Sequence, residues 1–364
     1  MENNNSLEKI ESISLIIIVM INKIILNIPY YIVNLTETGS IINVAYIGII
    51  DFIFLLVILK LFKNFENLDI IDLSEYLGGK PLKLIISIIS ILFFLLVGFT
   101  ALLDFSNVLH TIYFSQFQII YILGFFIFGI AIANFSGLKS ISRVTSFIVP
   151  FAIISILVTF IAVFKDLSIA SFTPVFGESY KNTFLKGLSN TFSMSIIIYY
   201  YFLKPLLKNP REFKKISIIS YIISFLLLLL TVISMLTIFT SHSTNAPINS
   251  LFLLARQIEL GTFLQRVDAL FILLWILSIF CYLSFIIFLV NKIIKKISNI
   301  SDEKMLTFST CSILFGLTLI PFNIAQLNFI EDIICRYVIL IFMLVIGIGL
   351  LIFSNIKWLR KKGC

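Results

Sequence analysis

Long apolar runs alternate with short polar segments along the whole chain. Ten runs are predominantly apolar, and all but the short fourth one have about the 20 residues that an α-helix needs to cross the hydrocarbon core of a bilayer. They cover residues 13–33, 42–62, 84–103, 119–133, 144–164, 184–203, 218–239, 269–290, 306–324 and 333–353. Within them apolar and polar residues do not alternate, as they would in the strands of an outer-membrane barrel. The pattern predicts an all-α integral membrane protein with about ten transmembrane helices.

Composition supports this class and excludes several others. Of the 364 residues 59% are hydrophobic and 13% are charged, whereas soluble domains carry about 25% charged residues. No Gly-rich phosphate loop, nucleophile elbow or helix with paired metal ligands is present in the sequence. The four cysteines form no C-x-x-C pair and predict no disulfide framework: they are Cys281, Cys311, Cys335 and Cys364. We expect no enzymatic activity, metal or cofactor.

The basic residues are distributed unevenly over the predicted loops. The formal net charge is +8, from 27 Lys and Arg against 19 Asp and Glu. With an even number of spans, 20 basic residues lie on the face of the two termini and 6 on the opposite face, while Lys23 lies inside a span. Because cytoplasmic loops collect Lys and Arg, we expect both termini in the cytoplasm and the longer connections 165–183 and 241–268 outside. The charge thus indicates membrane orientation and no nucleic-acid partner.

Ten helices divide into two sets of five that begin on opposite faces of the membrane. This is the arrangement of an inverted repeat, with repeats at about 12–164 and 184–356 of a single domain spanning 1–364. In such folds the first helix of each half is discontinuous, and its freed backbone groups form a midplane site. Polar residues interrupt both of these helices here: Asn22, Lys23, Asn27 and Pro29 in the first, and Gly187, Ser189, Asn190, Thr191, Ser193 and Ser195 in the sixth. Alternatively, these side chains join helix pairs without binding a ligand.

Two charged residues are predicted near the centre of the bilayer. Lys23 lies about ten residues, or roughly 15 Å, into its helix, and Asp51 lies at a similar depth. A charge at that depth costs about 2.5 to 3.5 kcal/mol, so we expect a Lys23–Asp51 charge pair. The pair either braces two helices or holds Lys23 beside the carboxylate of a ligand. Asn27 lies one turn from Lys23 on the same helix face.

The eighth segment contributes one further candidate, Trp275, which lies too deep for an interfacial belt. It either lines the predicted cavity or fills the bundle core. The predicted ligand-binding residues are therefore Asn22, Lys23, Asn27, Asn190, Thr191, Ser193 and Trp275.

Two stretches of the chain resemble a known family, the endospore germination permeases. These are the B-type membrane subunits of nutrient germinant receptors, within the amino acid–polyamine–organocation transporter superfamily. The stretch 245–280 is similar to the family pattern through Pro247, Arg256, Gly261, Phe263, Arg266, Asp268, Phe271 and Trp275. The stretch 172–195 is similar through Pro174, Gly177, Lys186 and Gly187.

The resemblance implies a subunit of the spore inner membrane that recognises a small nutrient, with an amino acid expected. It further implies that A-type and C-type receptor subunits are partners in triggering germination. Two alternatives stay open at this level. One is a secondary active amino acid transporter, with Lys23 replacing a coupling ion or Asp51 carrying a proton. The other is a structural membrane scaffold without a functional cavity.

Overall fold

The computed structural model describes most of the chain as helix. The described residues are 6–26, 28–65, 67–163, 172–177, 179–238, 267–298, 300, 302–320, 326, 330 and 336–362. Asn27, residues 164–171 and 178, and residues 239–266 with the motif residues between 245 and 266 lie outside this set, as do Cys335 and Cys364.

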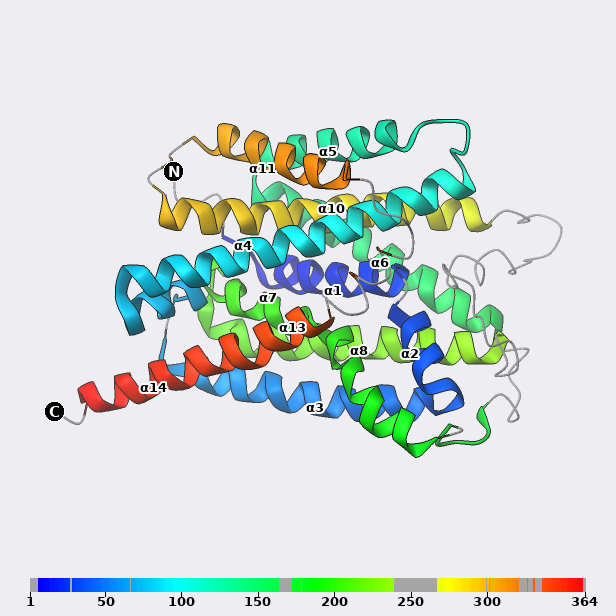
Figure 1. The fold of residues 1–364 in the computed structure, drawn as a ribbon, viewed down its shortest axis with the longest axis horizontal. Helices are drawn as coiled ribbons and strands as arrows, with labels where there is room; N and C mark the ends of the chain where they lie inside the picture. The colour runs from blue at the N-terminus through cyan, green and yellow to red at the C-terminus, as the bar shows by residue number, and fades with distance from the viewer. Residues whose placement is uncertain are drawn as a thin grey trace.

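The helices follow the predicted apolar segments (Figure 1). The α-helices are α1 Lys9–Ile25, α2 Ile28–Thr36, α3 Ser40–Leu61, α4 Ile70–Ile112, α5 Ile119–Phe135, α6 Leu138–Val163, α7 Ile196–Leu203, α8 Phe213–Ile238, α10 Val267–Ile297, α11 Glu303–Thr318, α13 Arg336–Ile341 and α14 Gly349–Lys362. Short 3₁₀ segments are η2 Glu37–Gly39, η3 Phe62–Asn64, η7 Lys186–Met194, η8 Lys204–Leu206 and η9 Pro210–Glu212, and π-helical segments are η6 Lys181–Leu185 and η11 Phe342–Ile348.

Five of the described helical runs are long and apolar enough to cross a membrane, judged by length and composition. They are Ile28–Asn64, Ile70–Ile112, Leu138–Val163, Pro210–Thr237 and Phe271–Ile297. The remaining predicted spans are shorter helices or helices interrupted by other conformations. The predicted all-α membrane protein is therefore confirmed, with discontinuous first and sixth helices. The internal inverted repeat stays a prediction.

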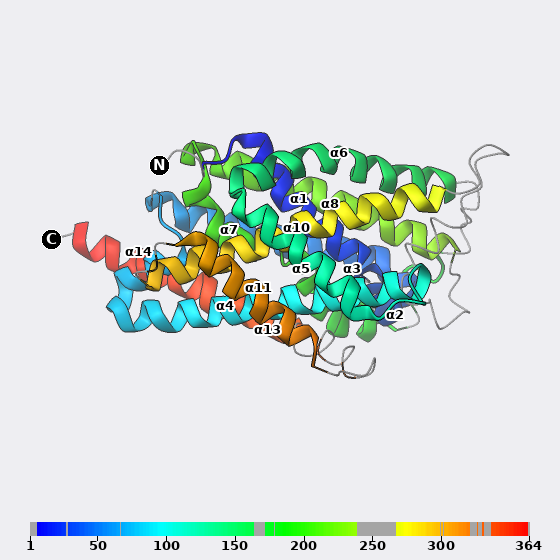
Figure 2. The same cartoon turned by 90° about the horizontal axis from the view of Figure 1, so that it is seen from above.

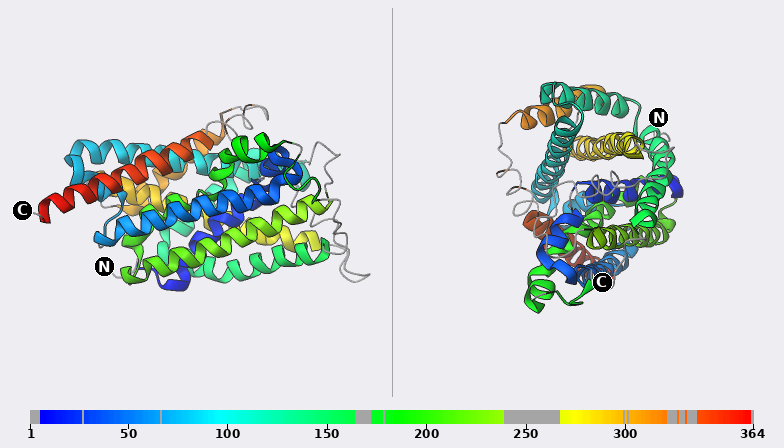
Figure 3. Two further views of the ribbon diagram at one scale, coloured as in Figure 1. Left: turned by 90° about the horizontal axis from the view of Figure 1, so that it is seen from below. Right: turned by 90° about the vertical axis from the view of Figure 1, so that its right-hand side faces the viewer.

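The helices run side by side along the long axis of the molecule (Figures 1 and 2). Helix α1 packs against α6, α8 and α10, and the end-on view places it in the interior of the bundle (Figure 3). Residues 14–25 of α1 are all buried. A helix that is apolar around its whole circumference suits such a surrounded position, as it suits a position in lipid.

Helix α4 begins well before the predicted segment 84–103. Gly79 has φ 70° and ψ −161°, a backbone conformation that glycine adopts without steric cost. The chain kinks there, and Pro81 falls in the first turn after the kink, where its missing N–H is not needed. The 43 residues of α4 therefore form a short leading helix and a long spanning one.

Asp69 caps α4 and anchors α10. Its Oδ1 accepts hydrogen bonds from the backbone N–H groups of Ile71 and Asp72, both at 3.1 Å. The Lys296 ammonium lies 2.6 Å from Oδ2 of Asp69 and 2.6 Å from Oδ2 of Asp72. Burial raises the pKa of the Asp69 carboxyl above its ordinary value, and the nearby Lys296 charge opposes this rise.

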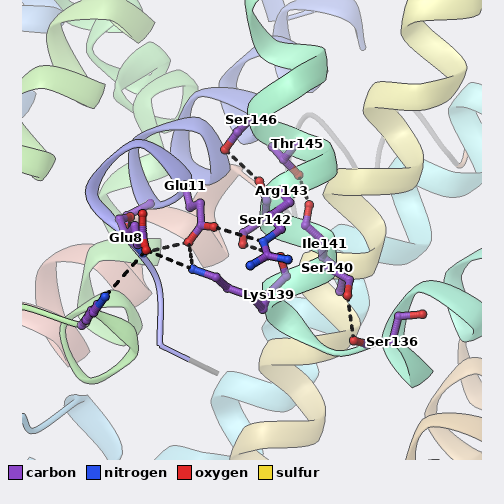
Figure 4. Close-up of polar contacts among 12 residues, drawn as sticks. Glu8, Glu11, Ser136, Lys139, Ser140, Ile141, Ser142, Arg143, Thr145 and Ser146 are labelled. Atoms are coloured by element: carbon purple, nitrogen blue, oxygen red, sulfur yellow. Dashed lines mark hydrogen bonds and ion pairs between the residues drawn. The ribbon is translucent and has the colours of Figure 1, made fainter. Parts of the chain in front are cut away.

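The start of the chain before α1 and the first turn of α1 are fastened to the segment after α7 and to the first turn of α6, at the same end of the bundle. The Leu7 N–H donates to the Leu206 carbonyl at 2.8 Å, and the Leu7 carbonyl accepts from the Lys208 N–H at 2.9 Å. Lys139 Nζ lies 2.7 Å from Glu11 Oε2 (Figure 4).

Two further lysines join other predicted basic loops at this end. Lys204 Nζ, which is buried, donates to the Phe62 carbonyl at 2.7 Å, and Lys357 Nζ donates to the Tyr76 carbonyl at 2.7 Å. Both chain ends lie here as well (Figure 1). We call this the terminal end of the bundle. The segments that the charge pattern assigned to one face thus meet in space.

Cysteine labelling tests the predicted orientation of the terminal end. In a chain whose four cysteines are replaced by serine, a cysteine at the exposed Lys214 position should resist an impermeant reagent applied outside the cell. A cysteine at Tyr180, which is 68% exposed at the other end, should react. This labelling pattern is expected because 20 basic residues lie on the face of the termini and 6 on the opposite face, and cytoplasmic loops collect basic residues. The reverse labelling pattern would contradict a cytoplasmic terminal end.

Candidate functional site

The first helix is interrupted where the sequence predicts it. Helix α1 ends at Ile25, and the Leu26 N–H donates to the Asn22 carbonyl at 2.8 Å. Helix α2 begins at Ile28 with Pro29 in its first turn. A backbone N–H at that position would have no acceptor within the helix, so proline fits there without loss of a hydrogen bond. The break therefore lies between the end of α1 at Ile25 and the start of α2 at Ile28.

Asn22 connects this break to α10. Its Nδ2 donates to the Ile18 carbonyl at 2.8 Å and to the Ser278 carbonyl at 3.1 Å, while Ser278 Oγ donates to Asn22 Oδ1 at 3.2 Å. Ser278 Oγ also lies 3.0 Å from the carbonyl of Trp275, which is buried and packs edge-on against Phe271. The structure thus joins the predicted residue Asn22 to Ser278, which lies one helical turn after a second predicted residue, Trp275. We call these three residues the α1–α10 cluster.

Ser278 itself is missing from the predicted site. Ser278 follows Trp275 by three residues, about one helical turn. This spacing places the two residues on one face of the helix, and it could have identified Ser278 from the sequence.

Lys23 lies in the last turn of α1 and is 9% exposed. The carbonyl end of a helix favours a cation, so this position stabilises the ammonium. The predicted Lys23–Asp51 pair is wrong for this conformation, because neither carboxylate oxygen of Asp51 has a hydrogen-bond partner among the described residues. Helix α8 packs against both α1 and α3, and α3 makes its main contacts with α8 and η7. Similar depth in the membrane therefore does not make Lys23 and Asp51 neighbours.

The sixth segment is not a continuous α-helix. It runs as the π-helical η6, the 3₁₀ segment η7 and a turn at Ser195 before α7 begins. Such conformations release backbone groups from the α-helical hydrogen-bond pattern. Three buried side-chain atoms here have no hydrogen-bond partner among the described residues: Asn190 Oδ1, Ser193 Oγ and Ser195 Oγ. Thr191 differs, since its Oγ1 donates to the Leu188 carbonyl at 2.7 Å.

Asn43 of α3 holds the interrupted sixth segment in place. Its Oδ1 accepts from Asn190 Nδ2 at 2.8 Å, and its Nδ2 donates to the Thr183 carbonyl at 2.8 Å. A Cβ at Gly187 would lie 2.2 Å from Asn43 Nδ2, so glycine is needed for this approach. Asn43, Asn190, Ser193 and Ser195 form what we call the helix-6 cluster. Sequence reasoning missed Asn43, although it is a polar residue inside an apolar segment.

The loop of residues 172–177 packs on η2 and η6 beside the helix-6 cluster. Thr38 Oγ1 donates to the Pro174 carbonyl at 2.7 Å, and Thr183 Oγ1 donates to the Phe176 carbonyl at 2.7 Å. Gly177 has φ 73°, and a Cβ there would lie 2.9 Å from the Thr36 carbonyl oxygen. Pro174 and Gly177 thus shape the contact between this loop, α2 and η6.

Buried tyrosines continue from the helix-6 cluster along α7. Tyr199 packs edge-on against Phe94 of α4 and stacks on Phe285 of α10 with ring centroids 5.9 Å apart. Its hydroxyl lies 3.5 Å from the hydroxyl of Tyr282. This aromatic wall joins α4, α7 and α10, and it was not predicted from the sequence.

The predicted site residues therefore fall into two clusters beside the two helix breaks. Among the described residues no hydrogen bond joins the α1–α10 cluster to the helix-6 cluster. Asn27 lies outside the described part of the chain. Within that same part, no group of three His, Cys, Asp or Glu side chains could hold a metal ion.

Comparison with known proteins identifies the family. A family model described as spore germination protein matches residues 6–327, and no curated protein matches the chain. Since the match covers most of the chain, the protein belongs to the spore germination protein family. The resemblance seen in the sequence is thereby confirmed at the family level.

Proposed function

We propose that this member of the spore germination protein family is a membrane subunit that recognises a small nutrient and triggers germination. An amino acid is the proposed nutrient, and A-type and C-type receptor subunits are the proposed partners. The proposed location is the spore inner membrane, with the terminal end of the bundle in the cytoplasm. The two halves, 12–164 and 184–356, are proposed to be inverted repeats that place their broken helices side by side.

The observation that carries this proposal is the set of unpartnered polar atoms in the helix-6 cluster. A buried polar atom without a partner costs about 1 to 3 kcal/mol, and Asn190, Ser193 and Ser195 each present one. The two serine hydroxyls can donate to a carboxylate, and Asn190 Oδ1 can accept from an ammonium group. An amino acid carries both groups a short distance apart, so its binding would satisfy all three atoms.

The remaining predicted residues have complementary roles in this proposal. Lys23, at the end of α1, supplies a cation on the side of the first break. Asn22 is held by Ser278 and fixes the position of that break against α10. Trp275 supplies an apolar surface for the nutrient side chain.

Leucine substitutions at Asn190 and Ser193 test the nutrient site. Asn190→Leu or Ser193→Leu is expected to raise the nutrient concentration for half-maximal germination about tenfold, since each removes a hydrogen bond to a charged ligand group. The response is measured in spores against amino acid concentration and normalised to immunoblot abundance. The control is Ser309→Leu, which replaces an exposed serine of α11 that bonds only its own helix at Met305. Equal loss of abundance and response would instead indicate a packing role.

Asp51 favours a second candidate function, secondary active transport of amino acids. A buried carboxyl without a partner is a group that can carry a coupling proton through the membrane. Uptake of a labelled amino acid into proteoliposomes, driven by a pH gradient, would support transport. A protein that binds the amino acid and shows no uptake is a receptor.

A further inference from the structure

Asp51 is a buried acid that the nutrient site does not use. It lies on α3 with 0% exposure, and both carboxylate oxygens lack a hydrogen-bond partner among the described residues. An ionised carboxylate in such a place would bear the full cost of desolvation. Buried acids commonly avoid this cost by holding a proton.

The neighbouring face of α8 is polar as well. Tyr221 lies close enough to Asp51 to interact electrostatically, and its hydroxyl donates to the Gly48 carbonyl at 2.6 Å. Ser217 and Ser224 lie one turn on either side of Tyr221, and the Oγ atoms of both are buried without a partner among the described residues. Because α3 and α8 are antiparallel, the Ser217 side of Tyr221 is nearer to the level of Asp51.

The other elements that pack on α3 present their charged side chains elsewhere. Lys181 of η6 and Lys186 of η7 are exposed, and Glu37 of η2 lies beyond the first residue of α3, at the end opposite the terminal end. Helix α14 contacts the last turn of α3 through Asn355, whose Nδ2 donates to the Leu61 carbonyl at 3.0 Å. Tyr221 is therefore the titratable group that interacts with Asp51 among the described residues. Tyr200 of α7 lies beyond it, interacting with Tyr221 and donating its hydroxyl to the Ser217 carbonyl at 3.1 Å.

We propose that Asp51 is a proton-binding site, loaded in this conformation, and that α3 couples it to the nutrient site. Loading adds one proton from water to the carboxylate, and unloading returns that proton to water and leaves the anion. The anion requires hydration or hydrogen bonds. In this conformation the Tyr221 hydroxyl donates to the Gly48 carbonyl and neither it nor Ser217 bonds Asp51, so unloading is coupled to a shift of α3 relative to α8 that brings these hydroxyls to the carboxylate.

The coupling path runs along one face of α3. Asn43, Ile47 and Asp51 are spaced by four residues, so they share this face, and Asn43 and Asp51 are separated by about 12 Å along the axis. Asn43 holds Asn190 and the Thr183 carbonyl of the sixth segment. A shift of α3 at Asp51 therefore acts on the helix-6 cluster. This coupling rests on the proposed function, whereas the proton site itself does not.

Infrared spectroscopy tests the proton site without any nutrient. Purified protein in lipid at neutral pH is expected to show the carbonyl band of a protonated carboxylic acid, and Asp51→Asn is expected to lose that band. The matched control is Asp302→Asn, at the exposed N-cap of α11, where the band should persist. If Asp51→Asn fails to accumulate, Asp51→Glu is used instead and should shift the band. Identical spectra for wild type and Asp51→Asn would overturn the proposal. A band that appears only when sodium is removed would overturn it as well, because Asp51 would then bind sodium in place of a proton.

The pH dependence of germination tests the coupling. With an equimolar mixture of the common amino acids as probe, the half-maximal dose for wild-type spores should change about tenfold between mildly acidic and mildly alkaline buffer. The dose for Asp51→Asn, which imitates the neutral acid, should change less than about twofold. An unchanged pH dependence in Asp51→Asn would overturn the coupling. If the proposed nutrient site is wrong, Asn190→Leu spores should germinate at the wild-type nutrient concentration. The infrared result for Asp51 would be unaffected.

Discussion

Lys296→Met is expected to lower the free energy of unfolding by about 3 kcal/mol, because it leaves the buried Asp69 carboxylate without its main counter-charge. The value lies at the lower end of the range for broken buried pairs, since Lys292 Nζ remains 4.0 Å from Asp69 Oδ2. Asp69 side-chain exposure is 2%, so water cannot replace the lost contact. Thermal unfolding in detergent and abundance in membranes measure the effect.

Two further variants separate this effect from a general loss of surface charge. Lys295→Met removes a lysine of the same turn that pairs with Glu303. Both side chains of this pair are largely exposed, so the loss of stability should stay under about 1 kcal/mol. Combining Lys296→Met with Asp69→Asn should recover most of the stability, because asparagine keeps an oxygen that can cap α4. Equal losses in Lys295→Met and Lys296→Met would contradict the importance of the Asp69 contact.

Gly187→Ala is expected to abolish most of the nutrient response while leaving much of the protein in the membrane. The new methyl group would lie 2.2 Å from Asn43 Nδ2 and 3.1 Å from the Asn182 carbonyl oxygen. Asn43 can rotate away at low steric cost, but it then loses its hydrogen bonds to Asn190 and Thr183. A loss of about 1 to 3 kcal/mol at the site corresponds to a rise of about fivefold to 150-fold in the effective nutrient concentration.

The matched control for this substitution is Gly124→Ala, because a Cβ at Gly124 meets no atom within 4 Å. Dose–response curves of spores that carry either variant, normalised to abundance, give the comparison. Equal sensitivity of the two variants would show that Asn43 does not organise the site.

The sequence is sufficient to predict the class of fold because lipid constrains it strongly. Backbone groups in hydrocarbon must bond within a helix or a closed barrel, so apolar runs of spanning length predict helices directly. The breaks in the first and sixth helices are predictable for the same reason, since Asn22, Lys23 and Asn190 are exceptional in such runs. The charge pattern also correctly grouped the basic loops that meet at the terminal end.

What the sequence by itself determined is therefore position along the membrane normal: which segments span, where two of them break and which loops share an end. Only the tertiary structure decided lateral neighbours, because helices at equal depth can pack in many orders. Asn22 pairs with Ser278 and Asn43 with Asn190, whereas Lys23 and Asp51 do not pair although their depths match. Helical periodicity tells which face of a helix is polar, but the choice of partner depends on the packing of the whole bundle.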